Sequence, residues 1–208
     1  GLIGARGYYV IQNYSEVKHH VFHAVFSGSG LVWYGGAIGG AIGILTWAHV
    51  RKVLDWPTLD MAATVLALGY AIGRIGCQVS GDGDYGMRAH GLDTMAYPHG
   101  TVPTPAGVTV YPTPIYETVT MGLLALLLWS LRDRVRPGVV FALYFVLSGV
   151  ERLLVEFIRR NHEVWIGLTA AQLESIGSAL GGLLLLAWLT RREGSLSPLP
   201  LAESASGA

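Results

Sequence analysis

The sequence predicts an all-α protein, a polytopic integral membrane helical bundle with about five full transmembrane helices and an outer loop region. Two observations lead to this prediction. Of the 208 residues, 51% are hydrophobic and only 13% are charged, and a typical soluble domain carries about twice that share of charge. The apolar residues also gather in long stretches, and about 20 apolar residues of helix are needed to cross a bilayer.

The expected spans follow one another along the chain with short polar connections. They cover residues 27–49, 58–79, 115–131, 137–158 and 170–190. In the first of them Gly35, Gly39 and Gly43 recur at every fourth position, a spacing that lets two helices pack closely in lipid. Residues 80–114 are rich in Gly, Pro, Thr and Tyr and are expected to form a loop.

One transmembrane domain is expected over residues 1–192. The segment 193–208 is rich in Ser, Pro, Ala and Gly and is expected to be a disordered tail. The net charge is zero, which argues against a nucleic-acid partner. The single cysteine, Cys77, has no partner for an intramolecular disulfide. Three histidines lie close together at positions 19, 20 and 23, but no cysteine or paired carboxylate completes a metal site, so no metal is expected.

Basic residues indicate how the bundle is oriented. They cluster after the first, third and fifth expected spans, as Arg51, Lys52, Arg132, Arg134, Arg136, Arg191 and Arg192. In a five-span path these clusters fall on one side of the membrane, which the positive-inside rule makes cytoplasmic. The 80–114 loop and the ends of the second and fourth spans then face outward.

The chain is organised around residues 73–86, where Arg74 stands at the end of a long apolar stretch. An ionisable side chain in a membrane segment is costly and is a functional hypothesis by default. Gly73 and Gly76 flank this arginine and would let a ligand approach the backbone closely. A cation beside an approachable backbone suits an anionic headgroup.

Two further polar segments are expected at the same outer depth, residues 111–117 and 151–160. In residues 151–160, Arg152, Glu156 and Arg159 are spaced to share one helix face. In residues 73–86, Asp82 and Asp84 follow Arg74. One interpretation is that these arginines and carboxylates only neutralise each other. Their concentration at one depth favours a binding site.

The ordered motifs resemble those of the prolipoprotein diacylglyceryl transferase family of the bacterial cytoplasmic membrane. The family's Gly-Arg-Ile-Gly-Asn motif is similar to residues 73–77, its His-Pro-Ser-x-Leu-Tyr-Glu to residues 111–117, and its Arg-x-x-x-Glu-Phe-x-Arg to residues 152–159. Its Phe-His-Gly-Gly is similar to residues 33–36. The resemblance runs from Gly4 to about Trp188.

Several positions depart from the family pattern. A family histidine is replaced by Tyr34, the asparagine by Cys77, the motif glutamate by Asp82, and a second histidine by Tyr111. The family's first span and most of its second would lie before Gly1. The anion-binding arginines are therefore kept, whereas the proton-handling positions are altered.

The resemblance implies an outward-facing active site in a multi-pass protein of the bacterial inner membrane. The expected reaction moves the diacylglyceryl group of phosphatidylglycerol to the lipobox cysteine thiol of a prolipoprotein, forms a thioether and needs no cofactor. The catalytic residues it implies are Arg74, Asp82, Arg152, Glu156 and Tyr34. The implied substrate-binding residues are Gly35, Gly36, Gly73, Gly76, Cys77, Tyr111, Tyr116, Glu117 and Arg159.

Arginines suit the phosphate because the planar guanidinium binds it bidentately and stabilises charge on the leaving group. The incoming thiol must lose its proton, and the candidate bases are Asp82, Tyr34, His90 and His99. A tyrosine with its ordinary pKa of about 10 is a poor base. Cys77 is not expected to be a nucleophile, because the substrate brings the thiol.

Two other classes of function remain open at this point. A member of the family that binds phospholipid without transferring it would keep the same arginines. A small transporter would also place charges and glycines within its spans, but it would usually show an internal repeat, and none is evident in the sequence.

Overall fold

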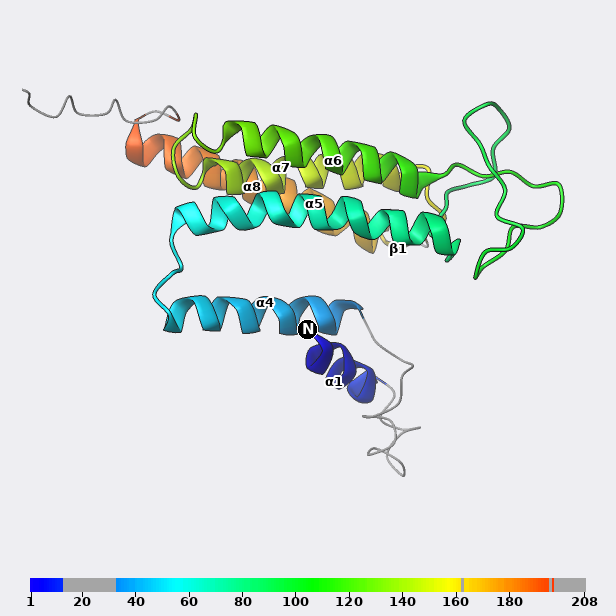
Figure 1. Cartoon of the computed structure of the whole chain (residues 1–208), viewed down its shortest axis with the longest axis horizontal. Coiled ribbons are helices and arrows are strands. Elements are labelled where there is room, and N and C mark those ends of the chain that lie inside the picture. The colour runs from blue at the N-terminus through cyan, green and yellow to red at the C-terminus, as the bar shows by residue number, and fades with distance from the viewer. Residues whose placement is uncertain (13–32, 162, 195, 197–208) are drawn as a thin grey trace, which may run out of the picture. The chain divides into compact units, whose positions relative to one another are not determined.

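The computed structural model describes residues 1–12, 33–161, 163–194 and 196, and the chain forms two compact units, Gly1–Asp55 and Trp56–Ala208 (Figure 1). The described residues are mostly helical, and among them the expected loop and helices are found where the sequence places them. The first expected span, 27–49, is described only from residue 33 onward. Most of the expected tail, along with residues 13–32, lies outside the described residues.

The first unit is a pair of packed helices, α1 (Leu2–Gln12) and α4 (Trp33–Val50). A glycine in α4 lets them approach, because a Cβ on Gly39 would lie 2.9 Å from the Cα of Gly4. The expected packing role of the glycine stripe is thus confirmed at Gly39. A Cβ on Gly43 would meet no described atom within 4 Å.

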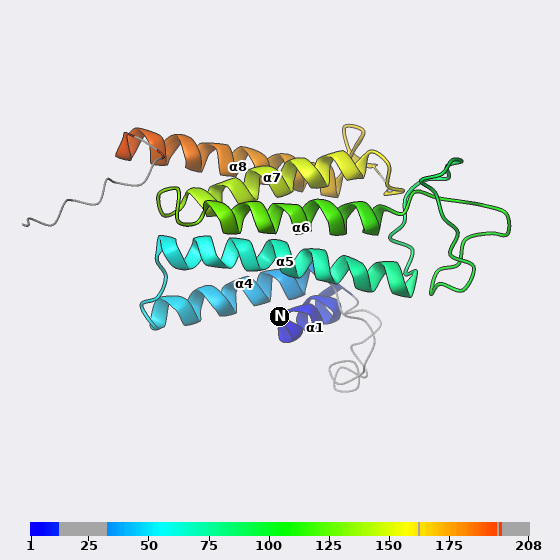
Figure 2. The same cartoon turned by 45° about the horizontal axis from the view of Figure 1, so that its top comes forward.

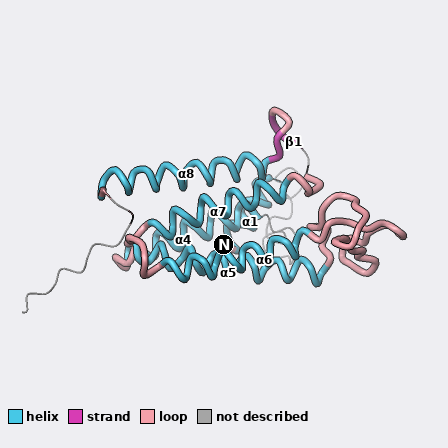
Figure 3. Tube along the Cα trace, turned by 90° about the horizontal axis from the view of Figure 1, so that it is seen from above, coloured by secondary structure: helices cyan, strands magenta, loops and turns pink. Residues whose placement is uncertain are grey.

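The second unit is a bundle of four helices, α5 (Trp56–Ser80), α6 (Thr113–Leu131), α7 (Val139–Glu156) and α8 (Ala170–Glu193). They lie side by side in both cartoon views (Figures 1 and 2). A short antiparallel hairpin of β1 (Glu163–Trp165) and β2 (Leu168–Thr169) joins α7 to α8 (Figure 3). The core of this unit is apolar and includes Ala67, Ala71, Met121, Leu124, Ala125, Leu128 and Val140.

Three described helices are long and apolar enough to cross a membrane, Trp56–Ser80, Thr113–Leu131 and Ala170–Arg192. Much of their apolar surface faces outward, as at Leu126 and Leu184, and lipid is the medium that such surface suits. The two other expected spans are also helical. However, the apolar part of α4, Ile38–Val50, is shorter, and α7 carries three charged residues in its last six positions.

Helices α7 and α8 pack closely because each has a glycine at the contact. A Cβ on Gly149 would lie 2.7 Å from the backbone oxygen of Ser175. A Cβ on Gly182 would lie equally close, 2.7 Å, to the backbone oxygen of Ala142. Small residues at both positions bring the two backbones together, as is common between helices in lipid.

The loop between α5 and α6 is folded onto itself at one end of the bundle (Figure 2). The rings of Tyr85 and Tyr97 stack with centroids 5.0 Å apart, and both pack with Val110 in a small core. The Tyr97 hydroxyl donates to Oε1 of Gln78 at 2.8 Å. Since Gln78 belongs to the last turn of α5, this bond attaches the loop to the helix end.

The start of α7 is capped by a side chain from another helix. Gly138, the residue before α7, has a φ of 94° and offers no side chain for capping. Instead, the buried carboxylate of Asp60 in α5 accepts hydrogen bonds from the backbone N–H groups of Gly138 and Phe141, both at 2.7 Å. The first N–H groups of a helix need such acceptors, and a negative charge there also complements the helix dipole.

We expect Asp60→Asn to lower the free energy of unfolding by about 1–3 kcal/mol, because an amide N–H₂ then faces a backbone N–H and a buried donor loses its acceptor. Thermal unfolding of the purified protein in detergent measures this. Asp133→Asn is the control, since its side chain is 79% exposed, and an exposed pair contributes only about 0.2–1 kcal/mol. Equal losses in both variants would contradict the capping role.

Candidate functional site

Three arginines converge on one buried carboxylate, that of Glu117 in the second turn of α6. Its side chain is 0% exposed. Oε1 accepts from Nη1 of Arg152 at 3.1 Å. Oε2 lies 3.1 Å from Nε of Arg74 and 3.3 Å from Nη1 of Arg159. A buried carboxylate is tolerated only with such partners, so the arginines supply what Glu117 requires.

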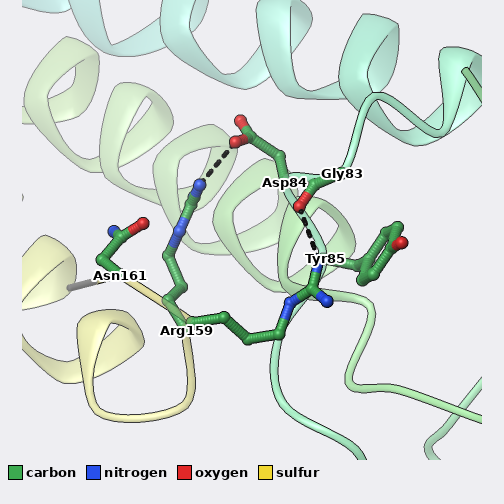
Figure 4. Close-up of a pocket in the computed structure, with 6 residues that line it drawn as sticks. Gly83, Asp84, Tyr85, Arg159 and Asn161 are labelled. Atoms are coloured by element: carbon green, nitrogen blue, oxygen red, sulfur yellow. Dashed lines mark hydrogen bonds and ion pairs between the residues drawn. The ribbon is translucent and has the colours of Figure 1, made fainter. Parts of the chain in front are cut away.

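A second carboxylate, Asp84, bridges two of these arginines from the loop. Its Oδ2 pairs with Nη1 of Arg74, and its Oδ1 lies 2.6 Å from Nη2 of Arg159 (Figure 4). Partial burial raises the pKa of Asp84, but the positive charges of Arg159 and Arg74 outweigh that effect and hold the pKa below its ordinary value of 3.8. Asp84 therefore stays ionised in the neutral range.

The third carboxylate, Glu156, ends α7 and contacts the start of α8. Its Oε2 forms an ion pair with Nη2 of Arg152 at 3.2 Å, although no group in the described residues donates a hydrogen bond to that oxygen. Its Oε1 accepts from Asn161 Nδ2 at 2.6 Å and from Thr169 Oγ1 at 2.7 Å. Thr169 is also the N-cap of α8, where it forms a capping box with Gln172.

The structure thus brings together six residues that the sequence singles out: Arg74, Asp84, Glu117, Arg152, Glu156 and Arg159. The predicted pairing of Arg152 with Glu156 at i and i+4 is present. The prediction that Arg159 continues the same helix face is wrong, because α7 ends at Glu156. The backbone then forms a turn, in which the backbone N–H of Arg159 donates to the backbone oxygen of Glu156 at 3.3 Å. This turn still directs the Arg159 side chain to Glu117.

The two loop aspartates have different surroundings. Asp82 is exposed, and its Oδ1 accepts the backbone N–H of Asp84 at 3.2 Å. Asp84, two residues later, is the one that reaches the arginines. An oxygen of each aspartate and Sγ of Cys77 lie within 4.8 Å of one another. Both oxygens of Asp84 are engaged by arginines, so this trio does not offer a free ligand set for a metal ion.

Other expected site residues make their contacts outside the cluster. The Tyr116 hydroxyl donates to the backbone oxygen of Asp93 at 2.9 Å. Tyr111 pairs through its backbone with Gly86 and Met87. His90 and His99, the histidines proposed as bases, are exposed in the loop.

The expected glycines beside Arg74 are exposed and are not packed against the arginine cluster. Gly73 and Gly76 are on an exposed face of α5, where an added Cβ would meet no described atom within 4 Å. Tyr34, Gly35 and Gly36 belong to α4 in the first unit. The side chain of Tyr34 lies outside what the structure describes.

Sequence reasoning did not single out Tyr70, Asn161 or Thr169. The Tyr70 hydroxyl accepts from Arg74 Nη2 at 2.9 Å and donates to Glu117 Oε1 at 2.8 Å. Tyr70 stands one helical turn before Arg74, a spacing that could have indicated the contact. Asn161 and Thr169 reach Glu156 through the turn and hairpin between α7 and α8, for which the sequence offers no comparable periodicity.

A family model described as prolipoprotein diacylglyceryl transferase matches residues 1–188 of this chain. The chain belongs to the prolipoprotein diacylglyceryl transferase family. This match confirms the resemblance that the motifs indicate.

Three relatives show how far the similarity extends. A Leptospira interrogans protein named phosphatidylglycerol–prolipoprotein diacylglyceryl transferase is 40% identical over 146 residues, which cover 68% of this chain and 45% of the relative. A Clostridium perfringens protein named as the second such transferase is 33% identical, over 89% of this chain and 73% of its own length. A Symbiobacterium thermophilum transferase of the same name is 34% identical, over 92% and 74%. The match thus spans less than half of the Leptospira protein and about three-quarters of the other two.

We expect the ion pairs of Asp84 to make stability depend on pH in the acid range. Because the folded-state pKa is depressed, their contribution is fully present above the unfolded pKa of about 3.9 and is lost as the pH falls through the lower folded pKa. Asp84→Asn should lower the free energy of unfolding by about 1 kcal/mol near neutral pH, a figure reduced for the partial exposure of Asp84.

Unfolding curves of the wild type and Asp84→Asn between about pH 3 and pH 7 measure this effect. The difference between the two proteins should be constant at higher pH and shrink below about pH 4. A difference that stays constant down to the lowest pH would contradict the ion-pair account of Asp84.

Proposed function

We propose that this chain transfers the diacylglyceryl group of phosphatidylglycerol to the lipobox cysteine thiol of a prolipoprotein, forming a thioether and releasing glycerol phosphate. The observation that carries the proposal is the convergence of Arg74, Arg152 and Arg159 at the loop end of apolar helices. A phospholipid at that depth would keep its acyl chains along the helices and its phosphate among the guanidinium groups. Membership of the family supports the same reaction.

The bridge made by Asp84 suggests where the phosphate binds. Its two oxygens each contact one guanidinium, from Arg74 and Arg159, and the two free oxygens of a phosphodiester suit the same pair of donors. The side chain of Asp84 is 36% exposed, whereas that of Glu117 is 0% exposed. Asp84 is therefore the carboxylate that can yield its place to the lipid phosphate.

This exchange preserves the charge balance of the cluster. Three arginines face three carboxylates, those of Asp84, Glu117 and Glu156. A phosphodiester carries one negative charge, the same as the carboxylate that it displaces. The lipid thus enters without leaving a buried cation unpaired, a state that would cost several kcal/mol.

In the reaction, the substrate sulfur attacks the lipid glycerol carbon that bears the phosphate. The new S–C bond forms as the C–O bond breaks, and the electron pair of that bond goes to the phosphate oxygen. Arg74 and Arg159 stabilise the charge that develops there. Arg152 is held between Glu117 and Glu156, which fixes its guanidinium for the same task.

The thiol proton needs an acceptor near the cluster. Of the two aspartates beside the cluster, Asp84 pairs with arginines, whereas Asp82 has no arginine partner among the described residues. Asp82 is exposed and lies close to Asp84. We assign the role of general base, which accepts the thiol proton, to Asp82, with His90, His99 and Tyr34 as the alternatives.

Arg74→Ala and Arg152→Ala should each lower kcat/KM by about 100- to 1,000-fold, the range for removing a donor that stabilises an oxyanion. The assay uses purified protein, phosphatidylglycerol vesicles and a lipobox peptide. Arg132→Ala is the control, because Arg132 follows the opposite end of α6 and pairs with the exposed Asp133. Turnover near that of the wild type in either variant would contradict the assignment of that arginine to the active site.

Asp82→Asn should lower kcat by about 100-fold with little change in KM for the lipid, because a general base contributes about 10²–10⁴-fold. Tyr34→Phe should change kcat little, since an ordinary tyrosine stays protonated at neutral pH. Asp93→Asn, another exposed loop aspartate, is the matched control. Full activity of Asp82→Asn would transfer the role to His90 or His99.

We further propose that the chain crosses the bacterial cytoplasmic membrane five times, with the arginine cluster toward the outer face. The basic residues at 132, 134 and 136 follow the end of α6 that is opposite to Glu117, which supports this orientation. In a Cys77→Ser background, a cysteine at position 93 should react with a membrane-impermeant thiol reagent in intact cells, and one at 134 should not. The reverse labelling would invert the orientation.

A further inference from the structure

A polar cavity of about 220 Å³ lies beside the arginine cluster (Figure 4). Its lining consists of Gly83, Asp84, Tyr85, Arg159, Arg160 and Asn161. The first three residues follow the end of α5 at Ser80, and the last three follow the end of α7 at Glu156. The cavity therefore lies just past two helix ends, on the loop side, where a headgroup would emerge. No aliphatic side chain lines it, so it does not suit an acyl chain.

One cation that lines the cavity, Arg160, differs from the three cluster arginines in its pairing. Each of Arg74, Arg152 and Arg159 pairs with two carboxylates. Arg160 forms no ion pair with any carboxylate in the part of the chain that the structure describes.

Arg160 is nevertheless held in place. Its guanidinium lies over the Tyr85 ring, 4.5 Å from the centroid, and its Nη2 donates to the Gly83 oxygen at 3.4 Å. The side chain is exposed and lines the cavity. A guanidinium that is oriented but has no carboxylate partner among the described residues is suited to bind an anion from solution.

The cavity shares two residues with the cluster, Asp84 and Arg159. A phosphate held at Arg159 would therefore border the cavity, and the polar substituent of that phosphate would extend into it. The volume of about 220 Å³ equals that of about seven waters in the liquid, which is room for a phosphate with a short polyol. The carbonyl of Gly83 and the carboxylate of Asp84 offer acceptors for hydroxyl groups.

We propose that this cavity is the leaving-group subsite, which binds the glycerol phosphate end of the lipid and retains glycerol phosphate after the C–O bond breaks. The inference rests on the proposed function. When the bond breaks, the phosphodiester with one negative charge becomes a monoester with a charge of about −1.5 to −2 near neutral pH. The cluster is already balanced by its own carboxylates, and Arg160 supplies the positive charge that the product newly requires.

The test measures binding of glycerol phosphate directly, by calorimetry on the purified protein in detergent, and as product inhibition of transfer. Arg160→Gln should weaken both by about tenfold, as expected for the loss of a charge-assisted hydrogen bond at an exposed site. Arg160→Lys should weaken them less, because it keeps the charge and loses only the planar fork.

Arg132→Gln is the matched control, since Arg132 also lies over an aromatic ring, that of Trp129, with 3.6 Å to its centroid. Its affinity for glycerol phosphate should equal that of the wild type. Unchanged affinity in Arg160→Gln would overturn the subsite. Inorganic phosphate that binds as tightly as glycerol phosphate would also overturn it, because the cavity would then not recognise the glycerol.

These measurements separate the subsite from the proposed function. Binding of glycerol phosphate that depends on Arg160, in a protein that transfers no diacylglyceryl group, would support the subsite and overturn the function. Transfer with product inhibition that is the same in Arg160→Gln and in the wild type would leave the function standing and overturn the subsite.

Discussion

The burial of the Glu117 carboxylate is the constraint on which the rest of the site depends. A carboxylate with no exposed side-chain surface is destabilising unless cations and hydrogen-bond donors surround it. Arg74 comes to it from α5, Arg152 from α7, and Arg159 from the turn after α7. One residue of α6 thereby fixes the relative position of three helix ends, and the arginines are oriented before any ligand binds.

Two other carboxylates extend this arrangement to the whole second unit. Glu156 joins the end of α7 to the capping box of α8 through Thr169. Asp60 joins α5 to the start of α7, far from the cluster, by accepting two backbone N–H groups. The close contact of α7 and α8 at Gly149 and Gly182 also holds these two helices together. Because the helices are fixed at both ends, the guanidinium groups keep the spacing that a phosphate requires.

Neutralisation and binding, which the sequence poses as alternatives, are compatible in this geometry. The arginines are fully paired, as a purely structural role would require. One of their partners, Asp84, is a half-exposed loop residue rather than a buried helical one. An ion cluster with one exchangeable anion can be stable when empty and still accept a phosphate of equal charge.

The sequence by itself determined the helices, the loop and the family, because these depend on local apolar length, turn residues and ordered motifs. It also determined the pairing of Arg152 with Glu156, which four residues of helix bring together regardless of the rest of the fold. Only the tertiary structure decided that Asp84, and not Asp82, bridges Arg74 and Arg159. The loop there turns through Gly81 and Gly83, with φ of 56° and 95°, and glycine at such angles does not specify which neighbouring side chain points inward. Arg159, the more distant of the two partners of Asp84, is 75 residues away. A contact of that separation is set by how α5 and α7 pack, which no local pattern encodes.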